Sequence, residues 1–530
     1  MPKVSTNSVS LRYGVQSALG SDPTVWKQLE PNTVGSFGNA ITTVARRPIS
    51  PRRGRRKGTT TDRDSTPEMD GDLTLDSFID FIEGFMYAQA VNSDFDLRSS
   101  GAAPAAVAST DDFTVDALGP TLAAKILDSS TTTTASGTLL YGKGYNNSAN
   151  NGFHVVNASV TGASTALSTS SALEDETPLS TTSPSPSLQI AGMRFAAGEL
   201  AFTLSGSTAT LVASTTGLTD WADLGLQAGM FIHIGSDDGT GAVQNALDDG
   251  AGTNNVYGYA RISSISTTTL NLDKLDTNLD ATDAANANTT DVMFGRFIRN
   301  VAVSDSDYIE RLYQFEATWS TLGSGSVPEY EYAIDNQANE MVVNLPLTDK
   351  ATVSWGFQGT RVEDIVVAGS RKSGAADAPE PLRTTAMNTS SDIASITTDV
   401  VSAVSDICFK SLTLTIANNA SPEKCLGTVG ASFINTGLFE VNLEGEMLFT
   451  SKEIVNAVSN NTTVTFLTIM KNEDGAIAMD MPTLTLSDGG RNLPVDESVT
   501  VTLTGASFTD PSLGYDFGVT VLASVPTVRD

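Results

Sequence analysis

The most regular pattern in this chain is an alternation of apolar and polar residues, which is typical of β-strands that bury one face. Between Tyr313 and Trp319 every second residue is apolar, and the residues between them are polar. The same alternation recurs at residues 330–332 and 353–357. We therefore predict a sheet from about residue 300 to residue 365.

A second set of alternating runs lies near the C-terminus, at residues 412–416, 499–503 and 515–521. These runs predict a second sheet. The intervening segment, residues 369–398, is small, polar and contains prolines. Such a composition is typical of a linker between two structural units.

A short motif occurs twice, each time before an apolar stripe with helical spacing. The sequence DGDLTLDSFI begins at Asp70, and EGEMLFTSKEI begins at Glu444. The 3-, 4- and 7-residue spacing after the first copy predicts an amphipathic helix over about residues 76–89. Thr450 and Glu453 have capping-box spacing in the second copy. We interpret the repeat as a duplicated unit whose helices pack through Leu75, Phe78, Ile79, Ile82, Phe85, Ile454, Val455 and Val458.

The region between the first helix and the first sheet has an organisation of its own. Residues 138–159 and 230–266 each contain a strand, a Gly-rich loop, an Asn pair and another strand. The two halves meet near the Pro- and Ser-rich run at 180–187. We therefore expect two small inserted β-barrels or sandwiches.

Composition and charge narrow the class of protein. The 530 residues are 40% hydrophobic and 17% charged, with 31 Lys and Arg against 61 Asp and Glu, which gives a net charge of −30. Such an acidic surface argues against broad nucleic-acid binding but suits a wall that DNA passes without adhering. The opening residues lack an apolar signal core and no membrane-length apolar run occurs, so we expect neither export nor membrane insertion.

The residues that commonly carry catalysis or bind cofactors are sparse. Only His154 and His233 are present, and we interpret both as structural. GTLLYGKG, ending at Gly144, lacks the Ser or Thr that a phosphate-binding loop requires. Acidic pairs such as 237–238 and 248–249 are interpreted as solvated turns. We expect no catalytic residue, no metal site and no cofactor.

Two cysteines are too few for a disulfide framework in a chain of this length. We interpret Cys408 and Cys425 as buried, reduced thiols.

One segment departs from the acidic balance, because seven basic residues fall within a short Pro- and Gly-rich stretch. They are Arg46, Arg47, Arg52, Arg53, Arg55, Arg56 and Lys57. Three interpretations stay open: an arm that docks on an acidic face of a neighbouring subunit, a solvated loop, or a direct contact with nucleic acid. We favour docking because a chain of charge −30 must assemble against its own repulsion.

Several of these segments resemble the tail tube (major tail) proteins of long, flexible-tailed bacteriophages. Residues 26–86 resemble the opening strand, long arm, strand and helix of that family, and DYIERLYQFEATW, the run from 329 to 359, and DFGVTVLASVP resemble its later strands. The resemblance implies a mainly β fold with two tube-type β-sandwich domains, each flanked by an α-helix, which form an inner β-barrel ring on oligomerisation. The inserted domains would project outward.

The domain organisation expected on this basis has six parts. Residues 1–99 would form the N-terminal part of the first tube domain, 100–190 and 191–298 the two inserted domains, 299–370 the rest of the first tube domain, 371–400 a linker, and 401–530 the second tube domain.

The resemblance also implies a structural virion protein rather than an enzyme. Its homo-oligomers would be trimeric rings of pseudo-sixfold symmetry, stacked into a tube that other tail proteins close at its ends. Phage DNA would pass transiently through this tube, which would be assembled in the host cytoplasm. The alternatives are a surface adhesin or S-layer-like β-repeat protein, and a glycan-binding or glycan-cleaving tail protein.

Overall fold

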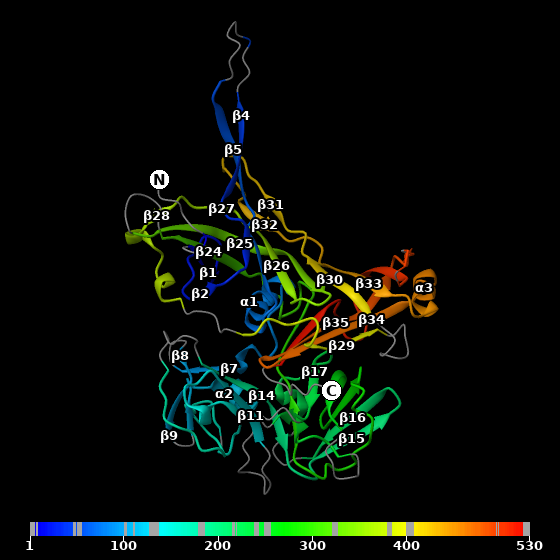
Figure 1. Cartoon of the computed structure of the whole chain (residues 1–530). Coiled ribbons are helices and arrows are strands. Elements are labelled where there is room, and N and C mark those ends of the chain that lie inside the picture. Colours follow the sequence, from blue (N-terminus) through cyan, green and yellow to red (C-terminus); the bar gives the residue numbers. More distant parts are fainter. Residues whose placement is uncertain are drawn as a thin grey trace.

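The computed structural model is mainly β, as expected, and consists of a body, a projecting hairpin and an inserted sheet below the body (Figure 1). The structure describes residues 6, 9–45, 49, 56–99, 103–109, 112–126, 137–158, 160–178, 186–214, 218, 220–237, 243–248, 256–320, 327–378, 384–398, 408–493, 495–496 and 498–522.

The body contains the strands on either side of the insertion. Its first group is β1 (Val9–Gln16), β2 (Trp26–Leu29), β3 (Thr33–Ser36), β4 (Asn39–Ala45), β5 (Gly58–Ser65), β6 (Glu68–Asp72), helix α1 (Leu75–Met86), β23 (Arg296–Arg299), β24 (Leu312–Trp319), β25 (Glu329–Pro346), β26 (Thr352–Gln358), β27 (Arg361–Val362) and β28 (Val366–Val367). Its second group is β29 (Ile393–Thr398), β30 (Phe409–Ala417), β31 (Ser421–Glu423), β32 (Phe433–Asn435), β33 (Glu440–Leu448), helix α3 (Lys452–Ser459), β34 (Thr463–Asn472), β35 (Gly475–Leu486), β36 (Arg491–Asn492), β37 (Thr500–Ser507) and β38 (Gly518–Leu522).

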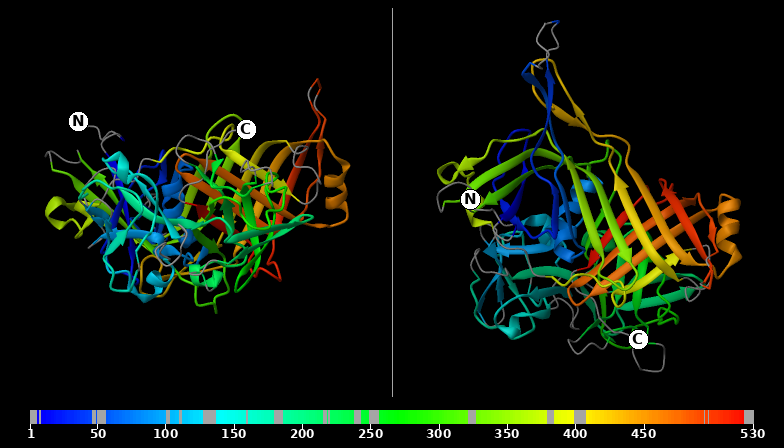
Figure 2. Two further views of the ribbon diagram at one scale, coloured as in Figure 1. Left: turned by 90° about the horizontal axis from the view of Figure 1, so that it is seen from below. Right: turned by 45° about the horizontal axis from the view of Figure 1, so that its top comes forward.

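The two predicted sheets are joined, which corrects the expectation of separate ones. The C-terminal half of the long strand β25 pairs with β30, from Glu340 opposite Ala417 to Pro346 opposite Ser411. Seven antiparallel strands therefore run side by side in the order β3–β6–β26–β25–β30–β33–β37 (Figure 2, right). We call this the wide sheet.

The two groups of body strands have the same order of pairing. In the first group β6 pairs with β3 and β26, and β24 pairs with β1 and β25. In the second group β33 pairs with β30 and β37, and β34 pairs with β29 and β35. A hairpin precedes β6 and another precedes β33, and a helix follows each of them.

Helix α1 fills the core behind the wide sheet. Phe78, Ile82 and Phe85 are fully buried on it, as the apolar spacing would place them. Phe81, at the centre of the aromatic contacts, lies 5.5 Å from the ring centroids of both Trp355 and Phe357. The helix ends three residues before the predicted end, and Tyr87, the next residue, has a positive φ of 49°.

The inserted region contains one large sheet with strands from both halves, a three-stranded sheet of residues 106–109, 112–114 and 166–168, and a strand pair at residues 236–237 and 243–244. Its elements are β7 (Asp96–Ser99), β8 (Ala103–Pro104), β9 (Ala106–Ser109), β10 (Asp112–Thr114), α2 (Gly119–Ala124), β11 (Gly137–Lys143), β12 (Gly152–Val155), β13 (Ala166–Ser168), β14 (Ser187–Phe195), β15 (Leu200–Ser205), β16 (Thr208–Ala213), β17 (Phe231–Ile234), β18 (Ser236–Asp237), β19 (Val243–Gln244), β20 (Gly258–Ser266), β21 (Thr269–Asp273) and β22 (Thr290–Met293). Strand β14 pairs with β11 on one side and β22 on the other, so strands from both halves share this sheet. The division at residue 190 stays a prediction.

The chain enters and leaves the inserted region at one point of the body. Val91 and Phe297 exchange two backbone hydrogen bonds, with N–O distances of 2.8 and 3.2 Å. The inserted sheet then packs against the face of β34 and β35 that is turned away from the wide sheet. Phe231, Tyr259, Leu467 and Ile469 form a buried apolar cluster there.

The segment predicted as a linker is in part built into the body. Strand β29 pairs with β34. Met387 is fully buried, and its backbone N–H donates to Leu73 while its carbonyl accepts from Ala351. Residues 384–398 therefore bind to both groups of strands.

Candidate assembly and conduit surfaces

The exposed face of the wide sheet is acidic. Directly paired residues lie on the same face of a sheet, so the pairing of these strands places seven carboxylates together. They are Glu68, Asp70, Asp72, Glu340, Glu440, Glu444 and Glu446. The other residues that strand pairing places on this face are mainly Thr, Ser and Asn. None of these paired residues is Lys or Arg.

The two copies of the repeated motif supply four of the seven acids, because they begin within β6 and β33. Alternation along each strand turns the acids outward and Met69 or Leu443 into the core. The glycine between the acids has a packing role in the first copy. A Cβ on Gly71 would lie 2.9 Å from the indole of Trp355, closer than side chains pack.

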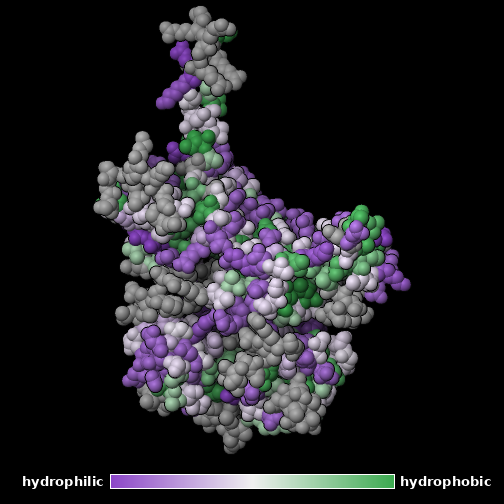
Figure 3. Space-filling model, in the orientation of Figure 1, coloured by the Kyte–Doolittle hydropathy of each residue, from purple (hydrophilic) through white to green (hydrophobic). Residues whose placement is uncertain are grey.

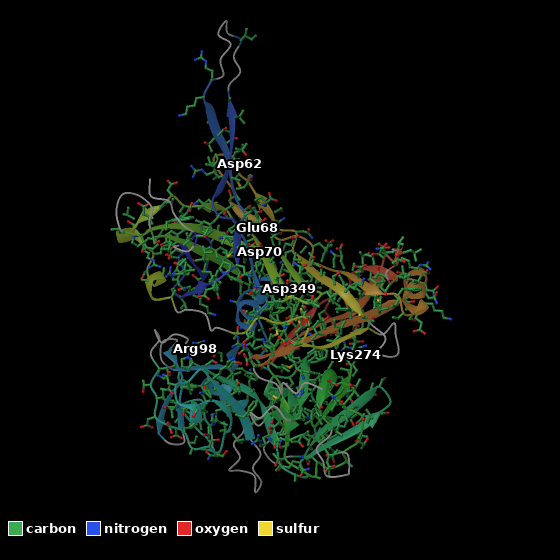
Figure 4. All side chains as sticks on the ribbon, in the orientation of Figure 1. Asp62, Glu68, Asp70, Arg98, Lys274 and Asp349 are labelled. Carbon is green, nitrogen blue, oxygen red and sulfur yellow. The ribbon has the colours of Figure 1, made fainter. Side chains whose placement is uncertain are left out.

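Hydroxyl and amide groups support several of these carboxylates. Asp70 accepts a hydrogen bond from the Thr33 hydroxyl at 2.7 Å, and Glu446 accepts one from the Thr500 hydroxyl at 2.6 Å. Lys350, in the turn beside the sheet, forms an ion pair with Asp72 at 2.8 Å. Glu68, Asp70 and Glu340 line a hollow in this face, and Figure 4 shows Glu68 and Asp70 below Asp62 along β5 and β6.

The predicted docking segment connects β4 and β5 in the sequence, and the hairpin formed by these two strands projects from the body (Figure 1). Arg46, Arg47, Arg52, Arg53 and Arg55 lie outside the described residues. Arg56 and Lys57 are described, and both are exposed just before β5. Ile41 and Val44 on β4 are 55% and 60% exposed, so the hairpin also presents apolar side chains.

A second hairpin braces the base of this projection. Lys424, next to β31, donates hydrogen bonds to Asp62 at 2.5 Å and to Asp64 at 2.7 Å. The bond to Asp62 contributes most to raising the pKa of Lys424, and the bond to Asp64 adds to it. The two hairpins therefore form one projection, whose base is fixed by an ion-pair network.

Strand β3 forms an open edge of the wide sheet. Among the described residues it pairs with β6 alone, at Thr33 opposite Asp70 and Val34 opposite Met69. Val34 is 40% exposed. An unpaired edge of this kind is available to a strand of another chain.

The predicted helix-packing residues lie on α1 and α3. Leu75, Phe78, Ile82, Phe85 and Ile454 are buried, whereas Ile79, Val455 and Val458 are half-buried. Phe81, which lies outside the strict apolar stripe, and Ala457 on α3 are also buried, although neither was predicted. The signal for Phe81 was its place between Phe78 and Phe85 in a helix with several aromatic residues.

Other candidate residues have structural surroundings. Burial lowers the pKa of His233 to about 3, and its Nδ1 lies 2.9 Å from the carbonyl oxygen of Gly235. His154 is buried against the ring of Phe113. The prediction of buried thiols was wrong, since Cys408 and Cys425 are both free and exposed on loops beside β30 and β31.

The described part of the chain has neither a cluster of metal ligands nor a membrane-length helix. It contains no group of three or more His, Cys, Asp or Glu side chains arranged to hold a metal ion. None of the helices in this part has the length and apolar character needed to cross a membrane.

The chain was similar to a known protein family but not to a curated protein. No curated protein matches the chain. A family model does match, over residues 267–509, somewhat less than half of the chain. The matched part runs from β21 to β37 and contains the second copy of the acidic motif together with most of the wide sheet. That family is described as phage tail tube protein, and the match, with the mainly β fold, supports a structural tail tube protein of a bacteriophage virion.

Proposed function

We propose that this chain assembles into rings that stack as the tail tube of a long-tailed phage, with the acidic face of the wide sheet lining the channel for DNA. The observation that carries the proposal is the wide sheet itself: one face is buried against α1 and the other presents seven carboxylates. A sheet that is apolar on one face and acidic on the other suits a wall between a protein core and a water-filled bore.

We infer that each chain contributes two tube units. The shared order of pairing, the hairpin before β6 and β33, and the helix after each support a duplication. The two units are already joined edge to edge by β25 and β30. Three copies joined in the same way would form a ring of six units, with pseudo-sixfold symmetry.

Ring closure would use the open edge of β3. Within one chain, the second unit begins its part of the wide sheet with β30, which pairs with β25. Strand β3 holds the same place in the first unit, beside β6. It would therefore pair with the end of the second unit of the next copy, near β35 and β36. Closure of this kind leaves the ring without a free sheet edge.

The acidic face gives the conduit a physical rationale. DNA carries one phosphate charge per about 1.7 Å of its axis, and lysines or arginines bind it by releasing counterions. A bore lined by carboxylates and hydroxyl groups offers no such exchange, so DNA would move through it without adhering. The inserted sheet packs on the opposite side of the body and would lie on the outside of the tube.

The projecting hairpins would join one ring to the next. Their basic residues would meet carboxylates of the adjacent ring, and the apolar residues Ile41 and Val44 would be covered there. The bonds between Lys424 and the two aspartates hold the projection in a fixed direction.

Cryo-electron microscopy of the purified protein across a concentration series, with mass photometry of the same samples, tests the proposal. We expect trimeric rings and stacked tubes, with β6 and β33 facing the bore. Monomers at all concentrations, even with tail-assembly initiator proteins added, would contradict it, as would a bore lined by a different face.

A further inference from the structure

Helix α3 is less covered than its counterpart α1. In the first unit, α1 packs on β25 of its own unit and on β35 of the second unit. It also packs on β23, a strand of the first group that pairs with β38 of the second. Helix α3 packs on β35 of its own unit and lies at the outer end of the body (Figure 1). Helix α1 thus contacts a strand of each unit, whereas α3 has no corresponding contact with the first unit among the described residues.

The surface around α3 is correspondingly apolar. Phe449, Leu493 and Val495 are 36%, 73% and 86% exposed, and Val455 and Val458 on the helix are half-buried. We call these five residues the α3 patch, and apolar surface is visible over this end of the body in Figure 3. Beside it is a crevice lined by apolar side chains, including Phe409, Ile454, Phe466 and Leu486.

The opposite end of the body has an uncovered surface at the matching place. Trp319 pairs with Glu329, and Glu331 pairs with Ala317, which is buried in the main core. Val367 also pairs with Glu329. Paired residues share a face, so these side chains lie on the core side of β24, β25 and β28, beyond the point where α1 covers it.

These residues have the character of an incomplete interface. Val367 is 61% exposed, and Trp319 is only partly buried. Partial burial raises the pKa of the Glu331 carboxyl. When the two hairpins are aligned by the register shift that they share, Met479 holds the place of Glu331 in the second unit, and it is buried in the core that contains α1.

We propose that the α3 patch of one copy docks on Trp319, Glu331 and Val367 of a second copy of this chain. Within one chain, α1 packs on β35 of the other unit, and the proposed contact repeats this packing between two chains. This inference rests on the proposed ring. Charge agrees with this pairing, because Lys452 is exposed on α3 whereas Glu329 and Glu331 lie on the opposing surface. The interface has an apolar centre with a charged pair beside it.

Aspartate substitutions in the full-length protein test the docking. Val458→Asp and Val367→Asp place a charge on either side of the contact, and Val303→Asp, at a residue 76% exposed elsewhere, is the control. We expect the first two variants to fold with the circular dichroism spectrum of the wild type but to give at least tenfold fewer rings by mass photometry. The control should form rings normally. Normal ring yield in both interface variants would overturn the inference.

A charge-exchange experiment distinguishes the loss of docking from misfolding. Lys452→Glu and Glu331→Lys should each lower the ring yield, and the double variant should restore it, which a folding defect would not do. If the double variant is no better than the single ones while wild-type rings form, the docking is wrong and the ring stands. If the wild type itself forms no rings, the proposed function fails and this inference fails with it.

Discussion

Arg261 of the inserted sheet donates a hydrogen bond from Nη1 to Oδ2 of Asp480 in the body, over 2.9 Å, and Asp480 is completely buried. The same guanidinium binds Asp273 through two further hydrogen bonds of 2.9 and 2.8 Å. Tyr515 donates to Asp480 at 2.8 Å. A charged network therefore joins the insertion to strand β35, at the edge of the apolar cluster between them.

Removing one partner of this buried pair should destabilise the protein strongly. Arg261→Met leaves the Asp480 carboxylate buried with only the tyrosine hydroxyl, at a cost of about 3–5 kcal/mol. Chemical denaturation of the assembly-free monomer measures the change. Asp273→Asn is the matched control and should cost less, because the side chain of Asp273 is 25% exposed. The double variant Arg261→Met with Asp480→Leu should recover much of the loss, and equal losses in all three variants would contradict this account.

Phe81 should be the most sensitive residue of α1. Phe81→Ala removes a side chain that lies within 4.9 Å of Tyr13 and 5.5 Å of Trp355, measured between ring centroids. We expect a loss of about 3–5 kcal/mol in the free energy of unfolding. Val455→Ala, at a half-buried position of α3, should cost well under half of that. Comparable losses at the two positions would mean that the core is not centred on α1.

Reversing charges on the wide sheet should make assembled tubes bind DNA. Asp70→Lys combined with Glu444→Lys replaces two exposed carboxylates in each chain by ammonium groups. We expect a short fluorescent duplex to bind these assemblies with an affinity that falls as salt rises, whereas the wild type does not bind it. Asp175→Lys combined with Asp280→Lys, both exposed on the inserted region, makes the same change in net charge and is the control. Equal binding by both variants would show that these acids do not line the bore.

Charge reversal at the base of the basic segment should separate ring formation from stacking. Arg56→Glu with Lys57→Glu should leave single rings intact and shorten or abolish tubes in electron micrographs, because the projecting hairpins would repel the acidic surface of the next ring. Lys27→Glu, an exposed basic residue on β2, serves as control. Tubes of normal length in the double variant would argue against docking by this segment.

Acidification should destabilise the monomer through its histidines. The pKa of His233 is lowered from 6.5 to about 3 by burial, so the folded state holds the neutral ring while the unfolded state gains a proton. The stabilisation is complete above pH 6.5 and is lost as the pH falls towards 3. Between pH 7.5 and 5.5 this one group should lower the free energy of unfolding by about 1.4 kcal/mol. His233→Asn should flatten that part of the pH profile, and an unchanged slope would contradict the assignment.

Sequence patterns predicted the strands, the helix α1 and the acidic motif well, because each depends on local periodicity. The apolar stripe of Phe78, Ile82 and Phe85 indicated which face of α1 is buried, and the repeat at Asp70 and Glu444 pointed to the two strands that carry most of the acids. These features are encoded within runs of about ten residues.

Features that depend on long-range pairing were out of reach. Nothing local to Glu340 or Ala417 reveals that β25 and β30 are neighbours, so two sheets were expected where the structure joins them. Met387 stands in a polar segment, yet its backbone binds Leu73 and Ala351, which are far apart in the sequence and meet only because β6 pairs with β26. The exposed thiols were misjudged because cysteine is usually buried, and only the fold places these two on loops.

The bridge between Val91 and Phe297 has a consequence for how such a protein can change over time. Because the insertion leaves and rejoins the body at a single pair of residues, the order of strand pairing in the body does not depend on what lies between them. A lineage could exchange this module, or an engineer could replace it with a displayed cargo, while the channel keeps its architecture. The requirement is that the new module covers the apolar face of β34 and β35 and supplies a partner for Asp480.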